Sequence, residues 1–394
     1  MKEPKIRFKG FSGEWKDLPF SEIVERTSST GKTGSLPGIE FEDIVSGEGC
    51  LNKDVYQKDC RKCGKIFREG DILFGKLRPY LKNILLAEFR GIAIGDFWIL
   101  RPGDNDSKFI YNLVNSEAFM RVANVSSGSK MPRADWNLVS STRFLLPQDK
   151  VEQEAIGKYF TSLDAQILAS TSRLVSLKKM KAASLQAMFP QEGETVPKVR
   201  FKGFKGEWKK VKLGEFGSWS KGKLLSKDNI SETGKFKCIH YGELFTMYDE
   251  IIYQVFSKTD LNNGCLSQIG DILFPDSDVT PTGLARCSSI METGVILGGG
   301  ILILRPLPQY YSPFISLSVN NEKQQIISRI TGTTVRHINA TSLSEIEIVC
   351  TENIAEQQSI ASFFTSLDRQ ITLHAQRLEK LKQIKAACLD KMFV

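Results

Sequence analysis

The sequence predicts an α+β protein in which two related mixed α/β domains are joined by two long antiparallel coiled-coil helices. Three observations lead to this prediction: a phrase near the N-terminus recurs in mid-chain, a second similar stretch closes each half, and the segments in between differ. At 394 residues the chain is long enough for two domains that each bury a core. We therefore expect two copies of one module, related by a pseudo-twofold axis.

The opening phrase, "PKIRFKGFSGEW" from Pro4, returns as "PKVRFKGFKGEW" from Pro197 with ten of twelve residues identical. The halves meet again at "GDILF" (from Gly70 and Gly270) and at "LRP" (from Leu100 and Leu304). The offset between copies grows from 193 to 204, so the second copy carries about eleven extra residues, all placed before "LRP". A solenoid would show a shorter period and at least three copies. With a solenoid excluded, the sequence predicts two modules that have similar ends and different interiors.

The C-terminal stretches of the two halves predict long helices. They begin at Glu152 and Glu356 and share 20 of 38 positions. Apolar residues follow a 3-4 alternation, typical of a coiled-coil seam and interrupted at Ser170 and His374. The predicted seam comprises Phe160, Leu163, Ile167, Leu174, Leu177, Phe364, Leu367, Ile371, Leu378 and Leu381.

Each helix would form a rod of roughly 57 Å and needs a partner for its apolar stripe. Because short linkers within one chain favour an antiparallel arrangement, we expect each helix to pair with the other copy. Two alternatives stay open at this stage: each helix on the surface of its own domain, or a homodimeric coiled coil. The predicted boundaries are a first domain at 1–150, a helix at 151–189, a linker at 190–196, a second domain at 197–354 and a helix at 355–394.

The segments between the repeats predict short strands and helices. Apolar runs follow the Gly-Asp turns at Gly70 and Gly270, and "ILGGGILILRP" is typical of a buried strand entered through glycines. Helical spacing appears in the stretches that begin at Lys108 and Tyr310.

Composition excludes few classes, but motifs exclude most enzymes. No apolar run approaches the ~20 residues of a membrane span, and the N-terminus has no signal-peptide pattern, which favours a cytoplasmic protein. The net charge of +8 is compatible with a polyanionic partner. "GKT" at 31–33 lacks the first glycine of a phosphate loop, because position 26 is Arg26. Pro275-Asp276 lacks the acid and lysine of a nuclease, and we found no other catalytic motif.

Eight scattered cysteines suggest free thiols. The single close pair, Cys60 and Cys63, has only Cys50 nearby and lacks the further ligands of a zinc site. The sequence therefore predicts neither a metal nor a catalytic site.

Taken together, the repeated "RFKGF.GEW" phrases, the two "GDILF" segments, the glycines at Gly128 and Gly332 followed by Ser or Thr, and the paired C-terminal helices resemble the specificity (S) subunit of type I restriction-modification enzymes. This resemblance covers essentially the whole chain. It implies that each variable segment is a target recognition domain that reads one half of a split sequence in double-stranded DNA. It also implies that the helices act as a spacer and dock two modification subunits, which methylate adenine, and that restriction subunits join the complex. No cofactor is expected on this chain, whereas S-adenosylmethionine, ATP and Mg²⁺ belong to the partners.

DNA contacts are expected from polar and basic side chains on loops at matching places in the two halves. The candidates are Lys76, Arg78, Tyr80, Lys82, Ser129, Lys130 and Arg133 in the first half, and Thr280, Thr282, Arg286, Thr333, Thr334, Arg336 and His337 in the second. Two other readings of the chain stay open: a freestanding two-domain DNA-binding regulator, and a coiled-coil protein scaffold.

Overall fold

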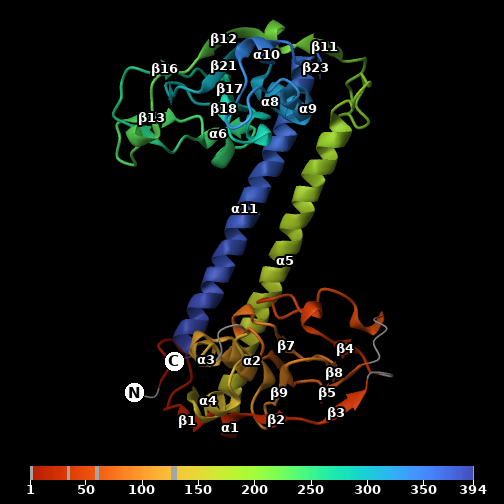
Figure 1. Ribbon diagram of the computed structural model, residues 1–394, viewed down its shortest axis with the longest axis vertical. Helices are drawn as coiled ribbons and strands as arrows, with labels where there is room; N and C mark the ends of the chain where they lie inside the picture. The colour runs from red at the N-terminus through yellow and green to blue at the C-terminus, as the bar shows by residue number, and fades with distance from the viewer. Residues whose placement is uncertain (1–2, 33–35, 58–61, 126–130, 394) are drawn as a thin grey trace. The chain divides into compact units, whose positions relative to one another are not determined.

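The computed structural model describes residues 3–32, 36–57, 62–125 and 131–393, and it divides into two compact units (Figure 1). Unit 1 contains Met1–Arg173 and His374–Val394, and unit 2 contains Leu174–Leu373. The two long helices are α5 (Lys150–Met188) and α11 (Ile354–Met392), each of 39 residues. Each unit therefore holds one part of both helices, together with one globular domain.

The domain of unit 1 has two four-stranded sheets, in the orders β2-β9-β6-β7 and β3-β5-β8-β4, and a two-stranded sheet β1-β10. Its strands are β1 (Lys16–Pro19), β2 (Glu25–Thr27), β3 (Thr30–Lys32), β4 (Gly38–Ile39), β5 (Cys63–Phe67), β6 (Ile72–Gly75), β7 (Ile84–Leu86), β8 (Gly91–Ala93), β9 (Phe97–Arg101) and β10 (Arg143–Leu146). Its short helices are α1 (Phe20–Ile23), α2 (Ser107–Asn115), α3 (Glu117–Ala123) and α4 (Trp136–Ser141).

The domain of unit 2 has a five-stranded sheet, β12-β21-β17-β19-β14, a four-stranded sheet, β15-β13-β20-β16, and two-stranded sheets β11-β23 and β18-β22. Its strands are β11 (Lys209–Lys212), β12 (Gly217–Lys221), β13 (Phe236–Ile239), β14 (Ile251–Ile252), β15 (Lys258–Thr259), β16 (Cys265–Leu266), β17 (Ile272–Pro275), β18 (Ser277–Asp278), β19 (Ser288–Ile290), β20 (Ile296–Leu297), β21 (Ile301–Pro306), β22 (Arg336–His337) and β23 (Glu347–Cys350). Its short helices are α6 (Glu243–Thr246), α7 (Pro281–Leu284), α8 (Ser312–Asn321), α9 (Lys323–Ile327) and α10 (Ala340–Ser344). The α+β prediction is confirmed in both units.

The helical stretches predicted from Lys108 and Tyr310 are each divided into two helices. In unit 1 the division falls at Ser116, whose hydroxyl accepts a hydrogen bond from the backbone N–H of Phe119 at 3.2 Å and so caps α3. In unit 2 it falls at Glu322, between α8 and α9.

The long helices pack against each other in antiparallel fashion. In unit 1 the Lys385 ammonium of α11 lies 2.5 Å from the Asp164 carboxylate of α5, and in unit 2 Lys181 of α5 lies 2.8 Å from Asp368 of α11. Ascending numbers on one helix meet descending numbers on the other, which defines the direction. The predicted antiparallel pair is confirmed. All ten predicted seam residues are buried or half-buried.

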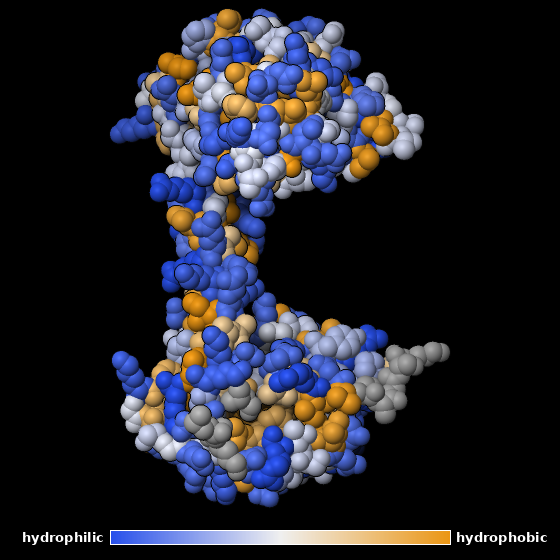
Figure 2. All heavy atoms as spheres, turned by 90° about the vertical axis from the view of Figure 1, so that its left-hand side faces the viewer, coloured by the Kyte–Doolittle hydropathy of each residue, from blue (hydrophilic) through white to orange (hydrophobic). Residues whose placement is uncertain are grey.

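The outer ends of the seam merge with the domain cores. Phe160 of α5 and Phe393, which directly follows α11, share one apolar cluster with Phe109 in unit 1. Phe364 and Phe189 occupy the equivalent places in unit 2, where the Phe189 ring packs on both Phe314 and Phe364. The exposed side chains of the helices are mostly hydrophilic on the face seen in Figure 2. Within the described residues no helix is long and apolar enough to cross a membrane.

The repeated opening phrase joins each domain to the helix pair. In unit 1 the backbone N–H groups of Lys5 and Ile6 donate to the carbonyl of Lys391 near the end of α11. In unit 2 the N–H of Val199 donates at 2.8 Å to the carbonyl of Ala187 near the end of α5. The phrase is therefore repeated because each copy binds the last turn of one long helix.

In each unit a buried ion pair joins the repeated opening phrase to the first turn of a long helix. Arg7 of the first phrase binds Glu152 with two hydrogen bonds of 2.7 Å, and Arg200 of the second binds Glu356 at 2.5 and 2.8 Å. Glu152 and Glu356 are almost fully buried. Because an unpaired buried carboxylate is costly, neither partner is free to change alone.

A second ion pair in each unit joins the repeated "GDILF" segment to the "LRP" phrase. The buried Asp71 carboxylate accepts two hydrogen bonds from Arg101, at 3.0 and 2.9 Å. Asp271 accepts two from Arg305, both at 2.8 Å. In each unit this bidentate pair joins the strand that directly follows the repeated aspartate to its neighbour in the sheet.

Candidate nucleic-acid interface

In unit 1 the two predicted DNA-contacting segments meet beyond the end of β6. Leu77 and Arg133 form an isolated antiparallel bridge. The N–H of Arg78 donates to the carbonyl of Pro132 at 2.8 Å, and the N–H of Ala134 donates to the carbonyl of Lys76 at 2.9 Å. The candidates Ser129 and Lys130 lie outside the described residues.

A carboxylate that the sequence did not suggest organises this pair of segments. Asp96 accepts a 2.9 Å hydrogen bond from Arg133, and the ammonium of Lys76 lies 3.5 Å away. Partial burial acts to raise the pKa of Asp96, but the hydrogen bond from Arg133 and the charge of Lys76 outweigh it, so this pKa lies below its ordinary value. Arg133 and Lys76 are thus held by the protein, and each keeps donors to spare.

The loop between Lys76 and Lys82 presents its side chains on a constrained backbone. Arg78 and Lys82 both have φ near 50°, in the left-handed region, and they flank the 3₁₀ turn Pro79–Leu81. The N–H of Gly47 donates to the carbonyl of Lys82 at 3.1 Å, which ties the loop to a neighbouring one. Arg78 and Tyr80 are exposed. Strained non-glycine residues that the surrounding structure over-determines are typical of functional sites.

Two further cations, Lys65 and Arg26, lie close to these candidates and were not among the predicted residues. Burial lowers the pKa of Lys65, and the nearby positive charges of Lys76 and Arg26 lower it further. The guanidinium carbon of Arg26 lies 4.4 Å from the centre of the Trp136 ring, within range of a cation–π contact. Neither cation lies in a repeated phrase, so no sequence signal distinguished them from other surface cations.

In unit 2 the corresponding segments meet in the same way beyond β17. Ser277 and Asp278 of β18 pair with His337 and Arg336 of β22. The N–H of Ile338 donates to the carbonyl of Asp276 at 3.0 Å, which matches the bond between Ala134 and Lys76 in unit 1. Each half therefore brings two such segments together with the same backbone arrangement.

The side chains on this shared backbone differ strongly from those of unit 1. Asp276 stands where unit 1 has Lys76, and its carboxylate pairs with Lys221 at 2.6 Å. The Ser277 hydroxyl lies 2.9 Å from Nδ1 of His337, and Arg336 donates a 2.5 Å hydrogen bond to the carbonyl of Val279. An aspartate therefore takes the place of Lys76, and His337 takes the place of Arg133.

The remaining candidates of unit 2 occupy three kinds of position. Thr333 and Thr334 are exposed on a loop closed by two hydrogen bonds between Thr331 and His337, at 3.0 and 2.8 Å. Gly332, in this loop, has φ of 94°, and a Cβ there would lie 2.3 Å from the carbonyl oxygen of Val335. A side chain at Gly332 would therefore strain this turn.

Thr280 caps the short helix α7 by accepting a hydrogen bond from the N–H of Gly283, and Thr282 is exposed on that helix. Arg286 differs from the other candidates, because its guanidinium donates to the backbone carbonyl of Tyr248 and is half-buried. This contact gives Arg286 a role in packing.

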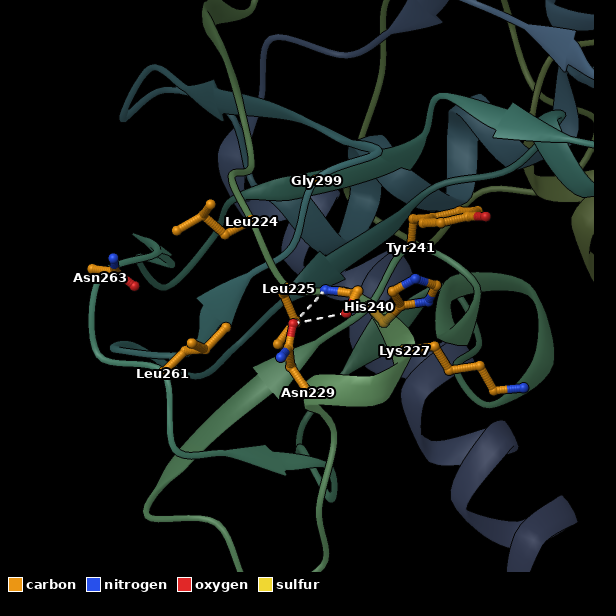
Figure 3. A pocket seen from close by; sticks show the side chains of 10 residues that line it. Leu224, Leu225, Lys227, Asn229, His240, Tyr241, Leu261, Asn263 and Gly299 are labelled. Atoms are coloured by element: carbon orange, nitrogen blue, oxygen red, sulfur yellow. Dashed lines mark hydrogen bonds between the residues drawn. The ribbon is translucent and has the colours of Figure 1, made fainter.

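Unit 2 also has a hollow of about 730 Å³ whose wall is mainly apolar (Figure 3). Leu224 and Leu225 line it with φ of 54° and 58°, and Asn229 holds the adjoining turn by accepting from the N–H and hydroxyl of Ser226. Burial lowers the pKa of His240 on its wall. In the part of the chain that the structure describes, no cluster of three or more His, Cys, Asp or Glu side chains could hold a metal; Cys60 lies outside that part.

Each unit thus offers an exposed pair of loops rich in hydrogen-bonding groups. Arginine, lysine, threonine, serine and histidine side chains can donate to base edges and phosphates, and aspartate can accept from cytosine. The two surfaces share their backbone and differ in chemistry, which suits the recognition of two different short sequences.

Comparisons with known proteins agree with this arrangement. Residues 205–383 match the family described as "Type I restriction modification DNA specificity domain". The fold is similar to that of the type I restriction-modification S subunit from M. genitalium, with 15% identity, a TM-score of 0.67 and coverage of 100% of this chain and 99% of that one.

A second similar structure is described as "Structural basis underlying complex assembly and conformational transition of the type I R-M system", with 18% identity, a TM-score of 0.53 and coverage of 96% and 97%. No curated protein sequence matches the chain. The family of specificity subunits is non-catalytic. The resemblance drawn from the sequence is thereby confirmed: residues 205–383 match the DNA specificity domain of type I restriction-modification systems, and the chain has the fold of an S subunit over its whole length.

Proposed function

We propose that this chain recognises a bipartite sequence in double-stranded DNA, with one half read by each globular domain. The observation that carries the proposal is the pair of loops in each unit: the same backbone hydrogen bonds hold them, and different side chains cover them. The domains at 1–150 and 197–354 are the two recognition domains. The helices at 151–189 and 355–394, with the linker at 190–196, set the distance between the halves.

The same proposal assigns chemistry to partners. Methylation of an adenine requires that the base leave the helical stack and enter a pocket of its own. We assign that pocket, with S-adenosylmethionine, to two modification subunits docked on the helices, and ATP and Mg²⁺ to restriction subunits. The setting is cytoplasmic.

The test is long-read, methylation-sensitive sequencing of a host genome after expression of this chain with and without its modification subunit. We expect methyladenine on both strands of one split motif, and only when both proteins are present. A complex that assembles but leaves DNA unmethylated would contradict the proposal. Tight, sequence-specific binding by this chain alone would favour the freestanding regulator, and a lack of salt-dependent DNA affinity would favour the protein scaffold.

Single substitutions then assign each half to its domain. Arg133→Ala should change or weaken recognition of one half of the motif, and Arg336→Ala should affect the other half. Each loss should be roughly 1–3 kcal/mol if the side chain contacts a base. If both variants keep the affinity and the motif of the wild type, the proposed loops are not the reading surface.

A further inference from the structure

A half-buried charge cluster attaches the second domain to the helix pair at a point outside the apolar core. Lys181 of α5 lies 2.8 Å from the Asp368 carboxylate of α11 and 3.0 Å from the carboxylate of Glu250, which directly precedes β14. The hydroxyl of Tyr253, just after β14, lies 3.0 Å from that of Thr365 on α11. Three chain segments of unit 2 therefore meet at one ammonium group.

The segment that carries Glu250 is firmly built into its domain. The backbone carbonyl of Glu250 accepts hydrogen bonds from the N–H of Ser289 at 3.0 Å and from the hydroxyl of Ser316 at 2.9 Å. The hydroxyl of Ser288 donates to the carbonyl of Asp249 at 2.7 Å. These hydrogen bonds join Glu250 to α8 and to β19, and β19 lies beside β17 in the sheet. The loops that are proposed to contact DNA lie beyond the end of β17.

The cluster lies at a distance from the other attachment of the domain. Phe189, in the apolar core, follows Lys181 by eight residues, which is about 12 Å along a helix. Two attachments separated by this length resist a tilt of the domain on the helices, whereas a single attachment at the core would act as a hinge.

The electrostatics favour the charged forms of Lys181 and Glu250. Burial acts to lower the pKa of Lys181, but the charges of Glu250 and Asp368 outweigh it and raise that pKa. Burial acts to raise the pKa of Glu250, but Lys181 outweighs it and the pKa lies below its ordinary value. Burial raises the pKa of Asp368, and the negative charge of Glu250 adds to this effect. The positive charge of Lys181 is therefore what holds two carboxylates together.

Unit 1 has the equivalent pair but lacks the third member. By the offset of 204 residues, Lys385 corresponds to Lys181 and Asp164 to Asp368, and these two groups pair at 2.5 Å. Among the described residues, no second carboxylate lies within ion-pairing distance of Lys385. The loop that would supply one contains Glu48, Gly49 and Cys50 and lines a hollow of about 650 Å³ together with Lys385, and Glu48 makes no ion pair with Lys385.

We propose that Lys181 is a positioning residue that braces the second recognition domain against the helix pair, so that the spacing between the two half-sites is held more rigidly by unit 2 than by unit 1. This inference rests on the bipartite recognition proposed above. The inference concerns the length of the spacer between the two half-sites, and not the bases that each domain reads.

The test measures which spacer lengths the complex accepts. Complexes of this chain with its modification subunit are given a plasmid library in which the two half-sites are separated by spacers of different lengths, and methylation is read by long-read sequencing. The variants are Lys181→Met, the matched control Lys385→Met in unit 1, and the charge exchange Lys181→Glu with Glu250→Lys. Amide hydrogen exchange of residues 248–253 is measured on each chain alone.

We expect the complex with Lys181→Met to methylate sites with neighbouring spacer lengths at least about fivefold more often, relative to sites with the preferred length. Amide exchange in residues 248–253 should become about tenfold faster. Lys385→Met should keep the spacer preference of the wild type, and the charge exchange should restore it. A purely structural role would lower the melting temperature of Lys181→Met without widening its spacer range, and this result would overturn the inference.

An equal widening in Lys385→Met, or a charge exchange that fails to narrow the range again, would overturn it as well. If the wild-type complex methylated no spacer length at all, the bipartite function would fail. The exchange data would still decide on the brace: protection of residues 248–253 that is lost in Lys181→Met supports it, and unchanged protection refutes it.

Discussion

The ion pair between Arg200 and Glu356 offers the sharpest prediction about the repeated phrase. The Glu356 carboxylate is fully buried and accepts hydrogen bonds from Arg200 at 2.5 and 2.8 Å and from the Thr351 hydroxyl at 2.8 Å. Arg200 also donates to the carbonyl of Gly206 at 2.6 Å. Arg200→Met would remove the charge that compensates the carboxylate and leave the packing volume almost unchanged.

The expected cost is set by the carboxylate that stays behind. Removal of one partner of a buried ion pair costs about 3–5 kcal/mol. For a unit of this size, 1 kcal/mol corresponds to roughly 2–4 °C, so we expect the melting temperature of unit 2 to fall by about 6–20 °C. Calorimetry or circular dichroism would measure it. Lys202→Ala is the matched control, because Lys202 is exposed in the same phrase and should cost no more than about 0.5 kcal/mol.

The double variant Arg200→Met, Glu356→Leu separates charge from packing. Because it removes the buried carboxylate as well, we expect it to be at least about 1 kcal/mol more stable than Arg200→Met alone. The reasoning would be refuted if Arg200→Met melted within 2 °C of the wild type, or if the double variant were the less stable of the two.

Three further predictions concern assembly, reading and pH. Leu163→Asp with Leu367→Asp should separate the buried helix seam and abolish assembly with modification subunits, seen by light scattering on a size-exclusion column; an intact, active complex would contradict the antiparallel pair. Arg78→Ala should cost roughly 1–3 kcal/mol of DNA affinity and relax one target position in a binding selection, whereas Arg90→Ala, equally exposed in unit 1, should do neither. Because burial holds the pKa of His240 below its ordinary value of 6.5, the unfolded chain takes up a proton first as the pH falls below 6.5, and the free energy of unfolding should decrease there. His240→Gln should flatten that slope in urea titrations between pH 5 and 6.5; an unchanged slope would show that other groups cause it.

The features that were predictable from the sequence are those with a period or a repeat. The 3-4 spacing of Phe160, Leu163 and Ile167 requires only helix geometry, so the seam and its antiparallel partner followed directly. The repeated phrases indicated two modules. The residues that the repeated phrases bind could not be predicted, because Arg7 and its partner Glu152 are 145 residues apart and no local pattern connects them.

For the proposed reading surface, the sequence indicated the segments and not the contacts between them. The bridge between Leu77 and Arg133 brings together loops that are 56 residues apart. Asp96 holds Lys76 and Arg133 from a third segment, and an isolated carboxylate in a loop has no sequence signature. Arg286 illustrates the reverse case: it lies in a promising loop, yet its side chain points to the backbone of Tyr248.

The pattern of identity between the halves therefore has a physical cause. Where the copies agree, the shared residues are buried charges with a specific partner, such as Asp71 with Arg101, or aromatic rings at the helix ends, such as Phe160. A change at one of these positions leaves a charge or a cavity that the remaining partner cannot compensate. Where the copies differ, backbone hydrogen bonds hold the loops, and backbone bonds do not depend on the side chain. Lys76 can therefore become Asp276 without loss of the fold, and a chain built in this way can change the side chains of the proposed reading loops while it keeps the backbone that holds them.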